Sequence, residues 1–351
     1  MSKNICFVLT NMKSGGLQRN ASILANHFSK NGNNVYICCL YSTECFFELD
    51  SKIQLIDCKS SKSKYRSISF WKKKLHSIFL DKKINAVISF GERCGIVTAK
   101  SIGELDVNHI CRGVNTKKNF LNRIMLNNSL RNITHFVFQT NAQKNLYSKN
   151  IQDKGVVISN PFETQTSNLN VDGVSSNRFI TVASFKLKQK RQDLMVEAFS
   201  LFSKEHPDYI FEFYGECDKE AQQNMLTLAE RYGIKDKIKL MGESKDIKDI
   251  IVPSKAFICA STYEGMPNAL IEAMSYGIPV ITSNWNGYDE IIEDNVNGLV
   301  FNMNNSLELS NLMKRITEDK ELFNKISDES WKICASKFSK EDALNKWDEL
   351  I

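Results

Sequence analysis

Short apolar segments alternate with longer amphipathic segments along the whole chain. In the first half, seven runs rich in Val, Ile and Phe have the length of β-strands. They are 4–10, 34–40, 53–57, 84–89, 107–111, 134–138 and 156–159. Helix-length segments such as 16–30 and 119–130 separate them. Near-continuous apolar strands between helices are typical of a parallel sheet covered on both faces, so this half predicts a doubly wound α/β domain.

The same alternation restarts after a polar segment without periodicity, residues 163–177. Beyond it, strand-like runs cover 178–184, 209–214, 237–241, 256–260 and 278–282, and helical patterns cover 189–204, 219–232 and 267–276. We therefore expect two Rossmann-like domains, 1–162 and 178–335, with 163–177 as their linker. Two such domains predict a cleft between the carboxyl ends of two sheets, which is where doubly wound proteins bind their ligands.

Composition narrows the class of protein. The chain has 351 residues, of which 42% are hydrophobic and 25% charged, as in an ordinary globular protein. No run approaches the roughly 20 apolar residues of a membrane-spanning helix, and the first residues read as a strand rather than a signal peptide. The ten cysteines include no CxxC pair and sit mostly in apolar runs, as free thiols do. The sequence therefore predicts a cytoplasmic protein.

Charge is distributed unevenly between the two halves. Residues 1–165 carry 24 Lys and Arg against 10 Asp and Glu, whereas residues 166–351 carry 22 against 30. Basic residues are densest in 59–83, together with Tyr65, Phe70, Trp71 and Phe79. This segment is either a solvated helix with core aromatics or a basic surface that lies on an anionic membrane. No recognition motif or stacking platform accompanies the charge, so nucleic acid is not an expected partner.

Two loops are candidate anion sites. The loop after the first strand contains Gly15 and Gly16, whose backbone amides can approach an anion at a helix N-terminus. It lacks GxGxxG spacing, which argues against a dinucleotide. The loop after strand 178–184 holds four cations, which suit a diphosphate or form a solvated basic turn. These cations are Lys186, Lys188, Lys190 and Arg191.

The segment STYEGMPNALIEAMSYG, residues 261–277, has the most specific pattern in the chain. Glu264 lies in a loop and Glu272 in the helix that follows, and they span roughly 10 Å. This spacing suits a nucleoside diphosphate sugar laid along the helix N-terminus. One carboxylate would accept from sugar hydroxyls and the other from ribose hydroxyls, so neither needs a metal. The backbone amides of Asn268, Ala269 and Leu270 would bind phosphate.

These motifs resemble those of the retaining glycosyltransferases that carry two glutamates seven residues apart (EX7E) and have the GT-B fold. That family includes bacterial capsule, O-antigen and teichoic-acid sugar transferases. The resemblance covers nearly the whole chain and is most specific at 264–281 and 289–300. It implies an α/β GT-B architecture with two doubly wound Rossmann-like domains facing a cleft. The first would bind the acceptor and the second the nucleotide sugar, and a last helix, 336–351, would cross back toward the first.

The resemblance also implies roles for individual residues. Lys190 would neutralise the leaving diphosphate and Glu264 would contact the transferred sugar, which makes them the catalytic candidates, and Glu272 would contact the ribose. Where the family has a Gly-Arg pair, this chain has Ala183 and Ser184, so Ser184, Lys186 or Lys188 would replace the arginine as a phosphate contact. The implied donor site comprises Gly15, Gly16, Ser184, Lys190, Glu264, Gly265, Met266, Pro267, Asn268, Ala269, Leu270 and Glu272.

Arg112, at a strand end in the first domain, is a candidate contact to either acceptor or donor, and a structural salt bridge is the equal alternative. No DxD motif occurs, so we expect neither a metal nor a cofactor besides the substrate.

The implied reaction moves a hexose or N-acetylhexosamine from a nucleotide sugar, UDP-linked by family habit, to a saccharide acceptor. We expect a lipid-linked acceptor and a place on the inner face of a bacterial membrane, in surface polysaccharide assembly. Two alternatives stay open: a non-catalytic nucleotide-sugar-binding partner subunit of a transferase, and a GT-B-type nucleotide-sugar epimerase. A nicotinamide-dependent oxidoreductase is disfavoured, because GxGxxG is absent.

Overall fold

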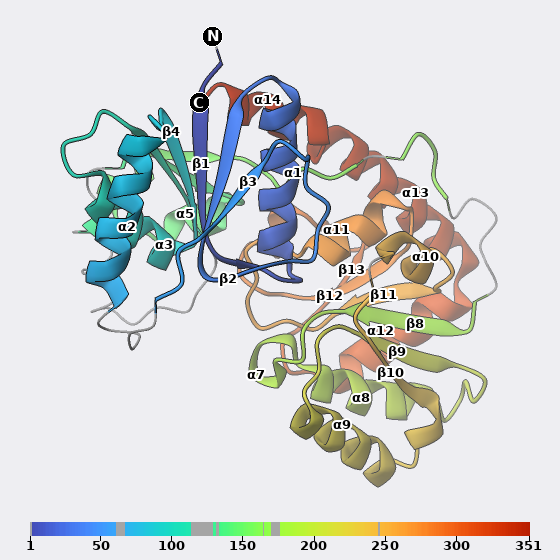
Figure 1. Cartoon of the computed structure of the whole chain (residues 1–351). Helices are drawn as coiled ribbons and strands as arrows, with labels where there is room; N and C mark the ends of the chain where they lie inside the picture. The colour runs from blue at the N-terminus through green and yellow to red at the C-terminus, as the bar shows by residue number, and fades with distance from the viewer. Residues whose placement is uncertain are drawn as a thin grey trace. The chain divides into compact units, whose positions relative to one another are not determined.

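A computed structural model describes residues 2–60, 67–113, 129–130, 133–163, 165–169, 176–244 and 246–351 (Figure 1). It divides into two compact units. Unit 1 comprises Met1–Pro161 and Glu341–Ile351, and unit 2 comprises Phe162–Lys340. All ten cysteines are free thiols. In the described ranges, no helix is both long and apolar enough to cross a membrane. Most of the expected helix 119–130 lies outside the described residues.

Unit 1 is built on a parallel sheet in which each of the seven expected runs forms a strand. The strands are β1 (Asn4–Met12), β2 (Asn34–Cys45), β3 (Gln54–Asp57), β4 (Ala86–Phe90), β5 (Asn108–Arg112), β6 (His135–Phe138) and β7 (Gly155–Val157). Their order in the sheet is β3-β2-β1-β4-β5-β6-β7, with every pair parallel. Every residue of β4 is buried, because both faces of a parallel sheet are covered.

Helices cover both faces of the unit 1 sheet. They are α1 (Gly16–Lys30), α2 (Ser67–Asp81), α3 (Glu92–Ile102), α5 (Asn141–Asn145), α6 (Lys149–Gln152) and α14 (Lys340–Asp348). Side chains alternate along β1, so Phe7 packs with α1 and α14, whereas Val8 packs with α2 and α3. The two helices α1 and α14 lie side by side (Figure 1), with His27 Nε2 2.9 Å from Asp348 Oδ1.

Helix α2 corrects the expectation for the aromatic residues of the basic segment. Trp71 and Phe79 are buried in the core against β1 and β2, and Trp71 Nε1 donates to the Cys58 carbonyl at 2.9 Å. Lys72, Lys73 and Lys74 are exposed. Helical periodicity thus places the aromatic rings inside and the lysines outside, so these two rings are not available to a membrane. Tyr65 lies outside the described residues.

Unit 2 repeats the same topology. Its strands are β8 (Arg178–Val182), β9 (Ile210–Tyr214), β10 (Ile238–Gly242), β11 (Ala256–Cys259), β12 (Val280–Ser283) and β13 (Leu299–Phe301). They are parallel in the order β10-β9-β8-β11-β12-β13. The sequence patterns missed β13, because three residues at a sheet edge give no periodic signal.

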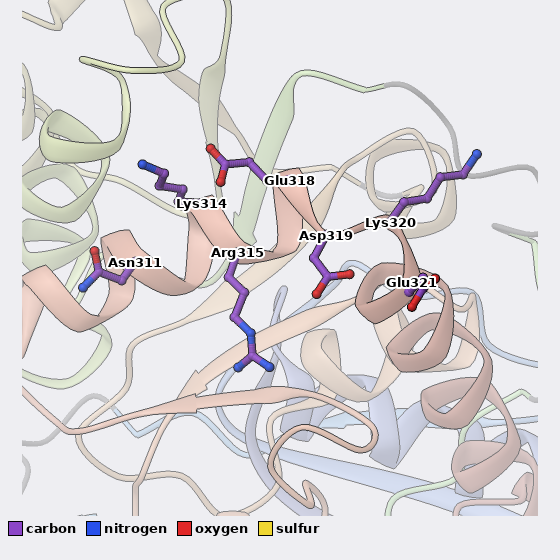
Figure 2. Close-up of a pocket in the computed structure, with 7 residues that line it drawn as sticks. All are labelled: Asn311, Lys314, Arg315, Glu318, Asp319, Lys320 and Glu321. Carbon is purple, nitrogen blue, oxygen red and sulfur yellow. The ribbon is translucent and has the colours of Figure 1, made fainter.

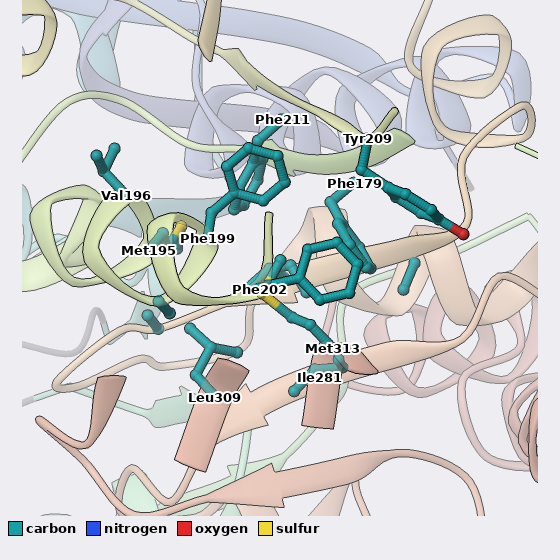
Figure 3. Close-up of a cluster of buried hydrophobic side chains, with 14 of the residues drawn as sticks. Phe179, Met195, Val196, Phe199, Phe202, Tyr209, Phe211, Ile281, Leu309 and Met313 are labelled. Atoms are coloured by element: carbon teal, nitrogen blue, oxygen red, sulfur yellow. The ribbon is translucent and has the colours of Figure 1, made fainter. Parts of the chain in front are cut away.

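Phenylalanines dominate one face of the unit 2 core (Figure 3). Phe179 of β8 and Phe211 of β9 pack against Phe199 and Phe202 on the neighbouring helix. The helices of this unit are α7 (Leu187–Lys190), α8 (Gln192–Phe202), α9 (Lys219–Arg231), α10 (Ile247–Ile251), α11 (Asn268–Ser275), α12 (Ser306–Glu318) and α13 (Lys320–Lys337). Two short 3-10 turns, η1 (Lys235–Lys237) and η2 (Tyr288–Glu290), complete it.

The described part of the expected linker is bound to unit 2. Asn168 Nδ2 donates to Asp328 Oδ1 at 2.8 Å, and Trp331 Nε1 donates to the Gln165 carbonyl at 3.1 Å. Leu169 N also donates to the Tyr276 carbonyl at 3.2 Å. The boundary between the units accordingly falls at Pro161 and Phe162, ahead of this segment.

Each sheet has one point at which the strand order reverses. It lies between β1 and β4 in unit 1 and between β8 and β11 in unit 2. Loops that leave neighbouring strands at such a point run in opposite directions and leave a crevice at the carboxyl edge, where open α/β sheets bind ligands. The loops that carry the candidate residues follow β1, β8 and β11.

Candidate active site

The loop after β8 presents its lysines unequally. Lys186 and Lys188 are exposed, whereas the Lys190 side chain is only 19% exposed. The difference arises because Lys190 ends the short helix α7 and Arg191 follows in the left-handed region, with φ +53. That turn separates α7 from α8, so the single helix expected at 189–204 is two helices.

Arg191 is engaged by unit 2 itself. Its guanidinium pairs with Asp193, with Nε 3.1 Å from Oδ1, and it also hydrogen-bonds Asn304. These contacts hold the left-handed turn, which costs a non-glycine residue roughly 1–2 kcal/mol. Of the four cations that the sequence places in this loop, Arg191 therefore has a structural role.

Two hydrogen bonds, one between backbone groups and one from a side chain, join the loop after β8 to the loop after β11. Thr262 N donates to the Gln189 carbonyl at 2.7 Å, and Gln189 Nε2 donates to the Tyr263 carbonyl at 3.2 Å. Lys190 and Glu264 are the next residues along each loop. The connection therefore brings together two residues that the sequence assigned to one site from separate motifs.

Lys190 and Glu264 form a partly buried ion pair. Lys190 Nζ lies 2.5 Å from Glu264 Oε1, and Ser261 Oγ donates to the same carboxylate oxygen at 2.5 Å. Burial alone would lower the pKa of Lys190, but the adjacent Glu264 carboxylate more than offsets this, so that pKa lies above its ordinary value. Lys190 is thus a fixed positive charge at neutral pH.

Ser261 is a site residue that the sequence analysis did not single out. Its hydroxyl donates to Glu264, its carbonyl accepts from Ser283 Oγ at 2.6 Å, and Cys259 Sγ lies 3.6 Å from its Oγ. These contacts come from β11 and β12, the rigid part of the sheet. Serine three residues before a loop glutamate was the available signal, because a hydroxyl at that spacing can reach the carboxylate within one turn.

Helix α11 begins directly behind Glu264. Pro267 is its N-cap, no side chain caps it, and its first turn contains no acidic residue. The amides of Asn268, Ala269 and Leu270 belong to this first turn, where helix N–H groups lack intrahelical acceptors and favour an anion.

The side chains around this helix start divide into two groups. Met266 and Leu270 pack in the unit 2 core, so they can offer a ligand only their backbone. Gly265, Asn268 and Ala269 are half-buried and Pro267 is buried. Glu272, on the second turn of α11, is buried.

Ser184 lies at the carboxyl end of β8, where the sequence placed a phosphate contact. Its carbonyl accepts from Gln192 Nε2 at 3.1 Å, and its side chain is half-buried. The backbone here lies close to Gly215, at which a Cβ atom would approach the Ala183 carbonyl oxygen to 2.2 Å. A glycine is therefore required after β9 for this loop to keep its place.

The candidate residues of unit 1 also lie at a carboxyl edge. Gly15 caps α1 with φ +151, and the first turn of α1 contains no acidic residue. Arg112 is the last residue of β5 and is buried, with Nη2 2.5 Å from Asn160 Oδ1. Among the described residues, the partner of Arg112 is thus an amide and not the carboxylate of the salt bridge that the sequence left open.

A hollow of about 620 Å3 lies elsewhere on unit 2, where α12 meets α13 (Figure 2). Both acidic and basic side chains line it, and none of the predicted site residues does. Its lining consists of Asn311, Lys314, Arg315, Glu318, Asp319, Lys320 and Glu321. Across the described ranges, no three His, Cys, Asp or Glu side chains are grouped so that they could hold a metal ion.

Known proteins match this chain in sequence over part or all of its length. Residues 170–332 match the family model Glycosyl transferases group 1. An uncharacterized glycosyltransferase of Haemophilus influenzae is 24% identical over 99% of this chain and 100% of its own length.

Two other relatives match over shorter stretches. A UDP-Gal:alpha-D-GlcNAc-diphosphoundecaprenol alpha-1,3-galactosyltransferase of Escherichia coli is 32% identical over 33% of this chain and 30% of its own. The capsular polysaccharide biosynthesis glycosyltransferase CapH of Staphylococcus aureus is 32% identical over 41% of this chain and 40% of its own.

Solved structures agree on the fold. Anabaena HepE, solved in complex with UDP and glucose, superposes with a TM-score of 0.84 over 98% of each chain at 15% identity. The two Rossmann-like α/β units are therefore those of the GT-B fold, as the sequence predicted. The family model thus matches most of unit 2, the relatives above are named as glycosyltransferases, and the solved structures share the fold.

Proposed function

We propose that the chain is a retaining, metal-independent hexosyltransferase that uses a UDP-sugar. The observation that carries this proposal is the Lys190–Glu264 ion pair at the strand-order reversal of unit 2, directly ahead of the N-terminus of α11. A partly buried cation and a row of helix amides suit the diphosphate of a nucleotide sugar, and the buried carboxylate beside them suits its sugar hydroxyls.

Each of these groups has a proposed role toward the donor. Glu264 accepts hydrogen bonds from hydroxyls of the transferred sugar, and Ser261 keeps its carboxylate in place. The amides of Asn268–Leu270 bind the diphosphate, and Glu272 accepts from the ribose hydroxyls. The amides of Gly15 and Gly16 in unit 1 are proposed to bind phosphate.

Lys190 is proposed to carry the main catalytic effect. When the bond between the anomeric carbon and the diphosphate breaks, negative charge grows on the departing UDP, and a positioned cation lowers the barrier by stabilising that charge. The raised pKa of Lys190 keeps the charge present throughout the neutral range. A divalent ion is then unnecessary for this step.

The acceptor is proposed to be a saccharide, lipid-linked, in the assembly of a surface polysaccharide. Support comes from the relatives, one named for a diphosphoundecaprenol acceptor and one for capsular polysaccharide biosynthesis. The exposed lysines of α2 in unit 1 would hold the protein at the anionic inner face of the membrane.

The proposal is tested by incubating the purified chain with single UDP-sugars and a lipid-linked saccharide in EDTA. We expect release of UDP and a product that keeps the anomeric configuration of the donor. UDP-glucose, UDP-galactose and their N-acetylated forms would be tried in turn. If a UDP-sugar binds but none of them yields free UDP, a non-catalytic partner subunit is favoured instead. Conversion of the donor to its epimer without free UDP would favour an epimerase.

A further inference from the structure

Polar side chains are buried at the carboxyl edge of unit 1, one at or just beyond the end of each of four neighbouring strands. Glu92 follows β4, Arg112 ends β5, Gln139 follows β6 and Asn160 follows β7. Each is less than 9% exposed. Ligands of parallel sheets bind at this edge. Buried polar groups need hydrogen-bond partners, so those at this edge either bind one another or a ligand.

Three of these residues are satisfied by local partners. Tyr147 OH donates to Glu92 Oε1 at 2.5 Å, and Gln139 Nε2 donates to the Gly113 carbonyl at 3.2 Å. Asn160 accepts from Arg112. Each of these contacts joins neutral groups or a single charge to a neutral group, so none of them cancels the charge of Arg112.

Arg112 is the exception in this row. Among the residues that the structure describes, its guanidinium makes one hydrogen bond, to Asn160 Oδ1, and lies over the Phe90 ring at 5.5 Å from its centroid. A guanidinium has five N–H donors, and an aromatic face and one amide use few of them. The arrangement leaves a planar donor fork of the kind that binds two oxygens of one anion.

Among the acids of unit 1 that the structure describes, none pairs with Arg112. Arg112 makes no ion pair with a described carboxylate, and burial, which lowers its pKa to about 10, is the cause of the shift. The parts of unit 1 outside the described ranges, 61–66, 114–128 and 131–132, contain no Asp or Glu. A buried cation without a counter-charge destabilises a fold, so its presence calls for an anion that arrives from outside.

We propose that Arg112 is an oxyanion-binding residue of unit 1, which takes a phosphate or carboxylate group of a substrate at the carboxyl ends of β4–β7. Asn160 holds the guanidinium against Phe90 so that its remaining donors face the ligand. This inference rests on the proposed function only for the identity of the substrate: the anion is either the diphosphate of the donor or an acidic group of the acceptor.

Calorimetric titration of the full chain with UDP and with inorganic pyrophosphate tests whether the anion is the diphosphate of the donor. Steady-state transfer kinetics test whether it is an acidic group of the acceptor. If the donor supplies the anion, Arg112→Gln lowers the affinity for UDP or pyrophosphate at least tenfold, and Arg112→Lys loses less. If the acceptor supplies it, Arg112→Gln leaves both affinities within twofold and raises the acceptor KM at least tenfold.

Asn160→Asp is a second test variant, which leaves Arg112 itself in place. It keeps the hydrogen bond to Arg112 but adds the missing counter-charge, so we expect it to reduce anion binding as Arg112→Gln does while leaving the melting temperature unchanged or higher. The inference is overturned if folded Arg112→Gln and Asn160→Asp both keep ligand affinities and acceptor KM within twofold of wild type. Should the wild-type chain transfer no sugar, the proposed function fails and the calorimetry alone decides the role of Arg112.

Discussion

Lys190 Nζ and Glu264 Oε1 lie 2.5 Å apart although 74 residues separate them in the chain. The two residues leave different strands, β8 and β11, on either side of the point where the unit 2 strand order reverses. Their contact joins the cation proposed to face the leaving group to the carboxylate proposed to face the sugar. The account of the reaction depends on this pair.

Replacement of Lys190 is expected to abolish most of the transfer activity. Removing one stabiliser of growing negative charge typically costs about 2.7–4 kcal/mol of barrier, so kcat of Lys190→Ala should fall by about 100- to 1000-fold. Lys190→Gln can still donate to Glu264 without the charge and should lose a similar factor. UDP release under saturating donor measures both.

Lys204→Ala serves as the control for the loss of a lysine elsewhere in unit 2. Its side chain is exposed, so we expect activity within threefold of wild type. Equal losses in Lys204→Ala and Lys190→Gln would show that transfer depends on the general positive charge of unit 2 and would remove the specific role of Lys190.

His109 is expected to make the stability of unit 1 depend on pH. It is buried in β5 with Nε2 2.9 Å from Ser89 Oγ, and burial lowers its pKa to about 3. Between an unfolded pKa of about 6.5 and this value, the unfolded chain binds a proton that the folded chain excludes, so the free energy of unfolding falls as pH falls. The free energy of unfolding at pH 4 should therefore be about 3 kcal/mol lower than at pH 7.

His109→Gln removes the titrating group, so its denaturant midpoint should change less between pH 7 and pH 4 than that of wild type. The substitution also costs stability at neutral pH, because the buried site is shaped for imidazole. If the denaturant midpoints of the two proteins fell equally between pH 7 and pH 4, His109 would not be the group that makes unit 1 sensitive to pH.

Gly215 is expected to be far more sensitive to substitution than Gly233. Both have positive φ, at +134 and +70, which costs an alanine roughly 1–2 kcal/mol. A Cβ atom at Gly215 would also meet the Ala183 carbonyl oxygen, whereas one at Gly233 would meet nothing within 4 Å. Denaturant unfolding should therefore show a larger loss for Gly215→Ala, and similar losses would indicate that the backbone after β8 yields easily.

The lysines of α2 are expected to bind the protein to anionic vesicles. Each basic residue near an anionic surface adds about 1 kcal/mol, so reversal of Lys72, Lys73 and Lys74 to Glu should weaken binding to phosphatidylglycerol vesicles by about 100-fold or more at low salt. Co-sedimentation at two salt concentrations measures the effect, which should shrink as salt rises.

A triple reversal of lysines 235, 237 and 239 in unit 2 changes the net charge equally and should leave vesicle binding nearly unchanged. The same loss in both triple variants would mean that net charge, and not the outer face of α2, governs the interaction.

The sequence predicted the two α/β sheets well because their central strands are short apolar runs. It placed the start of α1 at Gly16 correctly, since a glycine loop and an amphipathic helix both leave a local pattern. It missed the break at Arg191, which depends on Asp193 and Asn304, the second of them 113 residues away. It also left Trp71 as a candidate surface residue, because the composition of a basic segment does not say which face of the helix is buried.

The site was predictable only in part. The sequence named Lys190 and Glu264 as residues of one site through the family resemblance, but their contact depends on the hydrogen bond from Thr262 N to the Gln189 carbonyl, which no local pattern encodes. Ser261 escaped notice because a serine beside a strand is common.

The most direct test of the central claim is a crystal structure of the chain with a UDP-sugar bound in the presence of EDTA. The account predicts that Lys190 Nζ and the amides of Asn268–Leu270 lie within hydrogen-bonding distance of the diphosphate, with the Glu264 carboxylate on the sugar hydroxyls. A diphosphate held elsewhere, with Lys190 and Glu264 still paired and remote from the sugar, would contradict it.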